Sequence, residues 1–155
     1  MIISLNMSEN LNNHNIIKEI SFSLLTEGKS IKVRADGYSM YPAIKPGSII
    51  YIDPISSDSS PGPGEIIAWK RESGFVLHRL VRIIKKDNKT VYFTRGDSCA
   101  REDQPITFDQ IAGRIVRVEN REGEIAKYNK SVSYKPNYYF NRLIVLGIHI
   151  LKKIF

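Results

Sequence analysis

The feature of this sequence that most limits its fold is a series of short β-rich runs at close spacing. The runs cover residues 30–33, 48–53, 65–70, 75–85, 90–94 and 111–119. Turn-forming residues separate them, including the Ser-, Pro- and Gly-rich stretch 55–64 and the pair Asp87-Asn88. Little helix-forming sequence lies between the runs. This pattern predicts a mainly β fold, built as a coiled antiparallel sheet or a partly open barrel.

A helix is predicted on each side of the β-rich region. Apolar residues at positions 16, 17, 20, 24 and 25 have helical spacing, and Gly28 provides the end of that helix. At the other end of the chain, residues 138–155 are apolar with basic flanks. We therefore expect three parts. They are a helical leader over residues 1–29, a β-rich domain over residues 30–126, and a linker with a C-terminal amphipathic helix over residues 127–155.

The charge and the cysteine content restrict the partners and the cofactors. The 155 residues carry a net charge of +7, which favours anionic partners such as phospholipid head groups or nucleic acid. Cys99 is the only cysteine, which excludes an internal disulfide framework and a cysteine-rich zinc site. The N-terminal residues lack the pattern of a secretory signal peptide. We expect neither a metal nor a cofactor.

The C-terminal segment leaves two interpretations open. Its continuous apolar part is shorter than the roughly 18 to 20 residues that a membrane span requires. A short helix with basic flanks and aromatic residues is typical of an element that lies in the interface of an anionic membrane. The alternative is a terminal helix that caps the core or contacts a protein partner.

Residues 37–47, GYSMYPAIKPG, hold the first candidate for chemistry. Gly37 and Pro42 on either side of Ser39 are typical of a plain turn, but they would also present a serine hydroxyl at a fixed angle. A serine attacks at neutral pH only when a neighbouring base removes its proton. Of the three histidines, His14 lies in a polar leader and His149 in the C-terminal segment, whereas His78 lies within a predicted strand.

A carboxylate that orients His78 is the third requirement of such a site. An orienting carboxylate fixes the tautomer of a histidine base and stabilises the imidazolium that forms. Residues 94–105 supply Asp97, Glu102 and Asp103 in one loop. Taken alone, His78 also fits the role of a partly buried strand histidine. The three acidic residues, taken alone, also fit the role of acidic residues in a turn.

Five motifs together resemble a known family. Residues 37–47 resemble the Ser-Met-x-Pro box of type I signal peptidases and of their relatives in the wider signal peptidase and LexA-like superfamily. Residues 64–67, GEII, are similar to the Gly-[Asp/Glu]-Ile-Val box, and residues 77–81, LHRLV, look like the strand that carries the base. RGDS at 95–98 with 102–103 resembles the Gly-Asp-Asn box and its trailing Asp, and 112–115, AGRI, resembles the closing Gly-Arg strand. The five motifs occur in the family's order.

The resemblance implies a serine endopeptidase that cleaves a leader or signal peptide from a precursor through an acyl-enzyme. It assigns Ser39 as nucleophile and His78 as general base, in the manner of the endoplasmic-reticulum and archaeal enzymes, where a histidine precedes an arginine. Asp103 is the implied orienting carboxylate and Asp97 the supporting one, although the two could exchange roles. The remaining implied site residues lie beside the nucleophile and would contact the peptide substrate: Gly37, Met40 and Pro42.

The sequence departs from the family in lacking an N-terminal membrane span, so we expect a compact bacterial-type relative that is peripheral to a membrane or cytoplasmic. Lys45 and Lys70 are the rival bases between Ser39 and His78, and we interpret both as solvated surface charges.

Two other functions are open. A LexA-like self-cleaving regulator would explain the positive charge, but the leader is short for a DNA-binding domain, so nucleic acid is not expected. The other is a non-catalytic peptide-binding module.

Overall fold

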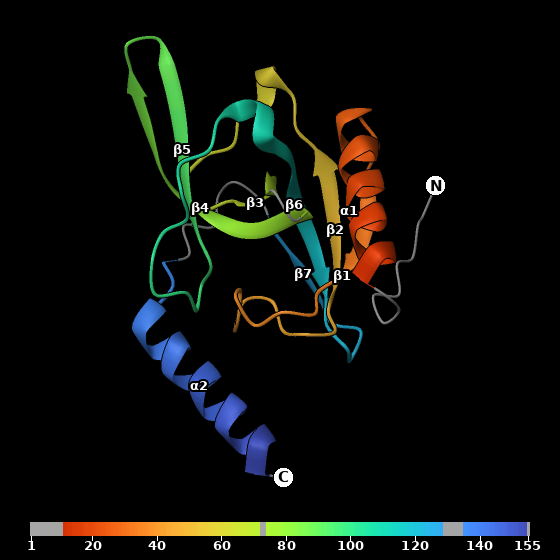
Figure 1. Cartoon of the computed structure of the whole chain (residues 1–155), viewed down its shortest axis with the longest axis vertical. Helices are drawn as coiled ribbons and strands as arrows, with labels where there is room; N and C mark the ends of the chain where they lie inside the picture. Colours follow the sequence, from red (N-terminus) through yellow and green to blue (C-terminus); the bar gives the residue numbers. More distant parts are fainter. Residues whose placement is uncertain (1–10, 72–73, 129–134, 155) are drawn as a thin grey trace.

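In a computed structural model, the chain is described over residues 11–71, 74–128 and 135–154. Within these ranges seven strands form one antiparallel sheet, and one helix lies toward each end of the chain (Figure 1). The strands are β1 (Ile31–Arg34), β2 (Ile49–Pro54), β3 (Ile66–Arg71), β4 (Gly74–Lys86), β5 (Lys89–Arg95), β6 (Ile111–Glu119) and β7 (Ile125–Lys127). The helices are α1 (Leu11–Thr26) and α2 (Tyr138–Ile154), with 3-10 helices η1 (Ser57–Ser59) and η2 (Phe108–Gln110). The predicted mainly β class with two flanking helices is confirmed.

The sheet is open and has the order β1-β2-β6-β3-β4-β5, so within the described chain β1 and β5 are its edges. The sequence predicts six of these strands but not β7, which pairs with Arg117–Glu119 of β6. All three side chains of β7 are exposed, so no apolar alternation marks it. The predicted domain boundary at residue 126 falls within this strand.

Two apolar clusters cover the two faces of the central strand β3. Ile66 and Ala68 belong to the larger cluster, which also receives Leu25 from α1. Ile67 and Trp69 point the other way and pack in the smaller cluster. Because successive strand residues face opposite sides of a sheet, a strand buried on both faces reads as a continuous apolar run. The helical leader therefore shares its core with the sheet.

The connections at the two ends of the chain are only partly described. Residues 1–10 of the predicted leader and residues 129–134 of the predicted linker lie outside the described residues. Gly28, at the predicted end of the first helix, has a φ of 80°, the left-handed conformation that commonly ends helices. None of the described helices combines the length and the apolar character needed to cross a membrane.

Candidate active site

The loop between β1 and β2 holds Ser39 in a fixed turn. Backbone hydrogen bonds close the base of the loop, where the amide of Ala35 donates to Ser48 O over 2.8 Å. Within it, the amide of Ile44 donates to Met40 O over 2.9 Å, and both side chains are buried in the larger apolar cluster. Ser39 is half-buried and immediately precedes Met40, which with Ile44 forms an apolar plug at the base of the loop. The plug therefore fixes the height of the serine above the core.

The three residues expected to contact substrate differ in exposure. Gly37 is exposed and Pro42 is half-buried, so both lie at the surface of the loop. The Met40 side chain is only 4% exposed and belongs to the core. Any contact of Met40 with a peptide would consequently be made by its backbone. The rival bases Lys45 and Lys70 are both exposed, as expected of solvated surface charges.

His78 lies on β4 and is oriented by Asp103. The distance from His78 Nδ1 to Asp103 Oδ2 is 2.6 Å. The Thr94 hydroxyl donates to the same carboxylate oxygen over 2.7 Å, and the Asp103 amide donates to Thr94 O over 2.8 Å. Thr94 is fully buried on β5, next to β4. The carboxylate is thus held by the neighbouring strand, and its bond with Nδ1 leaves Nε2 to face elsewhere.

The Nε2 atom of His78 and the backbone oxygen of Ser39 both border Gly96. A Cβ built on Gly96 would lie 2.7 Å from Ser39 O, 3.0 Å from His78 Nε2 and 2.6 Å from Cys99 Sγ. These three groups therefore surround one point, which only glycine leaves free. Among the described hydrogen bonds, none joins Ser39 Oγ to His78. Catalytic hydrogen bonds are often long before substrate binds, so the proximity of the two residues is the relevant observation.

Ser98 ties the nucleophile loop to the carboxylate loop. Its amide donates to Ser39 O over 2.9 Å, and its hydroxyl donates to Tyr38 O over 2.7 Å. Ser98 ends the RGDS motif, so the first and the fourth of the five motifs are in direct contact. This tether fixes Ser39 relative to the loop that carries Asp97 and Asp103.

Asp97 has a structural partner instead of the histidine. Its carboxylate accepts two hydrogen bonds from Arg79, at 2.8 Å from Nε and 2.7 Å from Nη2. Arg79 also donates to the carbonyl of Gly64, in the second motif, over 2.8 Å. Burial raises the pKa of Asp97, while the Arg79 guanidinium opposes the rise. The pair joins three of the motifs below the site.

The His78–Asp103 pair has shifted proton affinities. Burial alone would lower the pKa of His78, but the hydrogen bond to Asp103, helped by the adjacent Cys99 thiol, raises it to about 9. Burial opposes ionisation of Asp103, yet its hydrogen bonds with His78 and Thr94 hold its pKa below the usual range. At neutral pH the pair is therefore an imidazolium and a carboxylate.

Two cavities lie between α2 and the loops of the site. One, of about 480 Å³, is lined by Arg95 and Cys99 together with the first turn of α2. The other, of about 540 Å³, is lined by Tyr38 and Tyr41 together with Ile148 and Lys152 of α2. Each cavity thus borders a residue adjoining the Ser39–His78 pair. Among the described residues, no cluster of three or more His, Cys, Asp or Glu is arranged for a metal ion.

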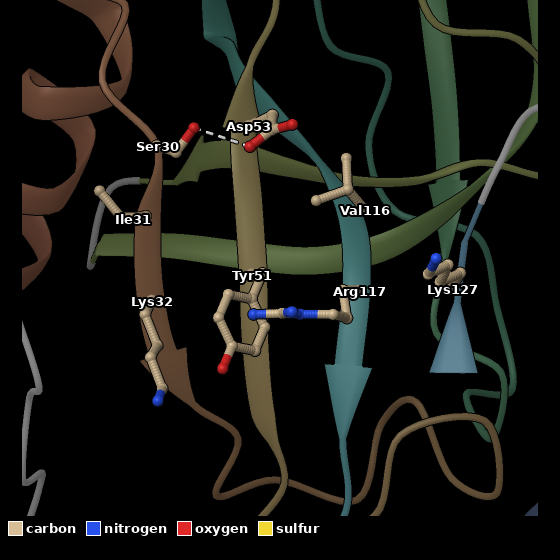
Figure 2. A pocket seen from close by; sticks show the side chains of 8 residues that line it. All are labelled: Ser30, Ile31, Lys32, Tyr51, Asp53, Val116, Arg117 and Lys127. Atoms are coloured by element: carbon tan, nitrogen blue, oxygen red, sulfur yellow. Dashed lines mark hydrogen bonds between the residues drawn. The ribbon is translucent and has the colours of Figure 1, made fainter. Parts of the chain in front are cut away.

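A third cavity, of about 430 Å³, lies over β1, β2 and β6, away from the predicted site residues (Figure 2). Figure 2 shows the Arg117 guanidinium stacked on the Tyr51 ring, with Lys32 beside the ring on the neighbouring strand β1. Arg117 lies 3.5 Å and Lys32 5.2 Å from the ring centroid. Both cations already have an aromatic partner, so we assign no ligand to this surface.

Several residues of the site were not predicted from the sequence. Thr94, Ser98 and Cys99 all contact the predicted residues, but we assigned none of them a role. The only sequence feature that points to these three residues is their position within three residues of Asp97. Polar residues in such a loop are too common for position alone to identify them.

No protein family model matches the sequence, and a search of curated proteins gives no significant match.

Proposed function

We propose that this chain is a serine endopeptidase of the signal peptidase-like type, which cleaves a leader peptide from a precursor. The observation that carries the proposal is the arrangement of His78, with Nδ1 2.6 Å from Asp103 Oδ2 and with Nε2 and the backbone oxygen of Ser39 both bordering Gly96. The order of the five motifs supports it independently. Peripheral membrane association or a cytoplasmic location fits the same proposal.

In the proposed mechanism, neutral His78 accepts the proton of the Ser39 hydroxyl as its oxygen attacks the carbonyl carbon of the scissile peptide bond. Asp103 stabilises the resulting imidazolium, which then protonates the leaving amine. Water repeats the sequence on the acyl-enzyme and releases Ser39. The amides of Ser39 and Met40 donate no hydrogen bond within the described chain, and they are the candidate donors to the oxyanion.

The Cys99 thiol is the competing nucleophile, because it lies against the same imidazole edge. A cysteine beside a histidine and a carboxylate also performs acyl transfer. The two candidates differ in which variant loses reactivity, so a single labelling experiment separates them.

A fluorophosphonate probe tests the nucleophile. We expect covalent labelling of the wild type and of Cys99→Ala, and none of Ser39→Ala or His78→Ala. Ser57→Ala is the matched control, because Ser57 is an exposed serine of η1 outside the site, and its labelling should equal that of the wild type. Intact-mass spectrometry measures the extent of labelling. Labelling that persists in Ser39→Ala, or that disappears in Cys99→Ala with folding intact, would contradict the proposal.

The rate of this labelling should depend on pH through His78. Only a neutral imidazole accepts a proton, and with the pKa of His78 at about 9 the neutral form amounts to about one per cent at pH 7. The second-order labelling rate constant should therefore rise by about tenfold per pH unit from pH 6 to pH 8 and level off above pH 9. A rate that is constant over this range would show that His78 is not the base.

A further inference from the structure

Most of the exposed apolar surface of this chain is concentrated on α2. Of the ten exposed large apolar side chains in the described residues, seven belong to this helix, and each of the seven is at least half exposed. They are Tyr139, Phe140, Leu143, Leu146, Ile150, Leu151 and Ile154. Five of them, at positions 139, 143, 146, 150 and 154, follow one another at three- or four-residue spacing, and the other two lie along one side of that stripe. The seven side chains therefore form one face, which we call the outer face of α2.

The opposite face of α2 is attached to the loops of the candidate site. Asn141, buried in the first turn, donates from Nδ2 to the carbonyl of Asp97 over 2.9 Å. Near the other end, Lys152 Nζ lies 2.6 Å from the Tyr38 hydroxyl, and the His149 ring packs edge-on against the Tyr38 ring. Figure 1 shows α2 as a separate rod beside these loops and apart from the sheet. The apolar outer face is thus held outward by polar contacts at both ends.

The charge of α2 indicates what covers this face. The helix has no Asp or Glu, and it carries Arg142, Lys152 and Lys153, all of them exposed. The whole chain has a net charge of +7. A second copy docked on the same face would bring two such chains together, and like charges would oppose the contact. An anionic lipid surface offers apolar depth together with negative charge, and aromatic residues at the start of α2 suit the head-group level.

We propose that the outer face of α2 binds the surface of an anionic phospholipid membrane, with the helix lying in the interface. The inner contacts with Tyr38 and Asp97 then hold the Ser39 loop and the carboxylate loop at a fixed position relative to the lipid surface. Membrane binding in this form does not depend on the proposed peptidase activity. Ser39→Ala should bind vesicles as the wild type does, so the two proposals can fail separately.

Flotation of the full chain with vesicles tests the proposal. Vesicles of phosphatidylcholine with about 30% phosphatidylglycerol should bind the wild type at least about tenfold more tightly than phosphatidylcholine alone. Leu143→Gln/Ile150→Gln should weaken binding to the anionic vesicles by at least about tenfold, because two large apolar side chains leave the interface. The matched control is Ile84→Gln/Ile125→Gln, which removes exposed isoleucines of β4 and β7 and should bind as the wild type does.

Two single lysine substitutions test the contribution of charge. Lys153→Gln should weaken binding to anionic vesicles by about fivefold, whereas Lys85→Gln, an exposed lysine of β4, should leave it unchanged. Tyr139→Trp gives an independent measurement on a folded chain, since Trp69 is the only native tryptophan and is buried. Its emission should shift to shorter wavelength when anionic vesicles are added.

Three results would overturn the proposal. The first is equal binding by the wild type and by Leu143→Gln/Ile150→Gln. The second is the absence of a Tyr139→Trp shift with anionic vesicles. The third is a wild-type dimer in sedimentation that this double variant dissociates, because the outer face would then contact a second copy.

Discussion

Replacement of Asp103 by asparagine is expected to slow acylation of Ser39 by about 10⁴-fold while leaving the fold intact. In the neutral, reactive form of His78 the Asp103 carboxylate accepts a hydrogen bond from Nδ1, so the proton is on Nδ1 and Nε2 can act as the base. An asparagine amide can donate to Nδ1 instead, which stabilises the tautomer with the proton on Nε2. That tautomer cannot accept the proton of Ser39.

The rate is measured with a fluorophosphonate or with a peptide substrate, and Glu102→Gln is the matched control. Glu102 adjoins Asp103 but pairs with the exposed Arg82, so its substitution should change the rate less than about twofold. A second readout separates orientation of His78 from general damage. Without the carboxylate, burial lowers the pKa of His78, so the pH at which the residual rate levels off should fall from about 9. A rate for Asp103→Asn within about tenfold of the wild type would contradict the assigned role of Asp103.

Most strands of the sheet could be predicted from the sequence, because the pattern of apolar and polar residues along a strand depends on which of its faces are covered. β3 is an apolar run because both its faces are covered, and β4 and β6 are long enough to reveal their character. β7 has three exposed residues and no such pattern. It exists because Gly123, with a φ of 82°, turns the chain back onto the free side of β6. Pairing of this kind depends on the rest of the sheet and cannot be recognised within three residues.

The residue types of the candidate site could be predicted, and the family resemblance favours Asp103 as the partner of His78, but the residues alone leave Asp97 and Asp103 interchangeable. His78 and Arg79 are consecutive on β4, so their side chains point to opposite faces of the sheet. A carboxylate that pairs with His78 therefore lies on one face of the sheet, and a carboxylate that pairs with Arg79 lies on the other. The structure brings Asp103 to His78 and Asp97 to Arg79. This choice depends on how the loop after β5 folds back over Thr94, which local sequence patterns do not encode.

The position of α2 was equally inaccessible from the sequence. Helical spacing predicts an apolar face for residues 138–155, but it does not indicate which residues hold the helix to the domain. The hydrogen bond from Asn141 to the Asp97 carbonyl joins positions 44 residues apart. It places α2 against the carboxylate loop, so the membrane-binding proposal concerns the same loops as the peptidase proposal.

The second large effect is expected in stability, on replacement of Asp97 by alanine. Arg79 is 3% exposed and Asp97 is fully buried, so the substitution removes the Asp97 carboxylate from its ion pair with a buried guanidinium. Breaking a buried pair in this way costs about 3 to 5 kcal/mol of unfolding free energy. The matched control is Glu102→Ala, which breaks the exposed Arg82–Glu102 pair of similar length and should cost about 0 to 1 kcal/mol. Urea unfolding followed by circular dichroism measures both values.

A double variant separates the ion pair from the packing around it. In Arg79→Leu/Asp97→Leu the buried charge is removed with its partner, and such replacements are often close to neutral. One cost remains, because the carbonyl of Gly64 loses the hydrogen bond from Arg79, worth about 1 kcal/mol. The double variant should therefore be more stable than Asp97→Ala, although it changes twice as many residues. If Asp97→Ala instead costs no more than Glu102→Ala, then Arg79 and Asp97 do not hold the loops of the site together, and the fixed position of Ser98 and Ser39 needs another cause.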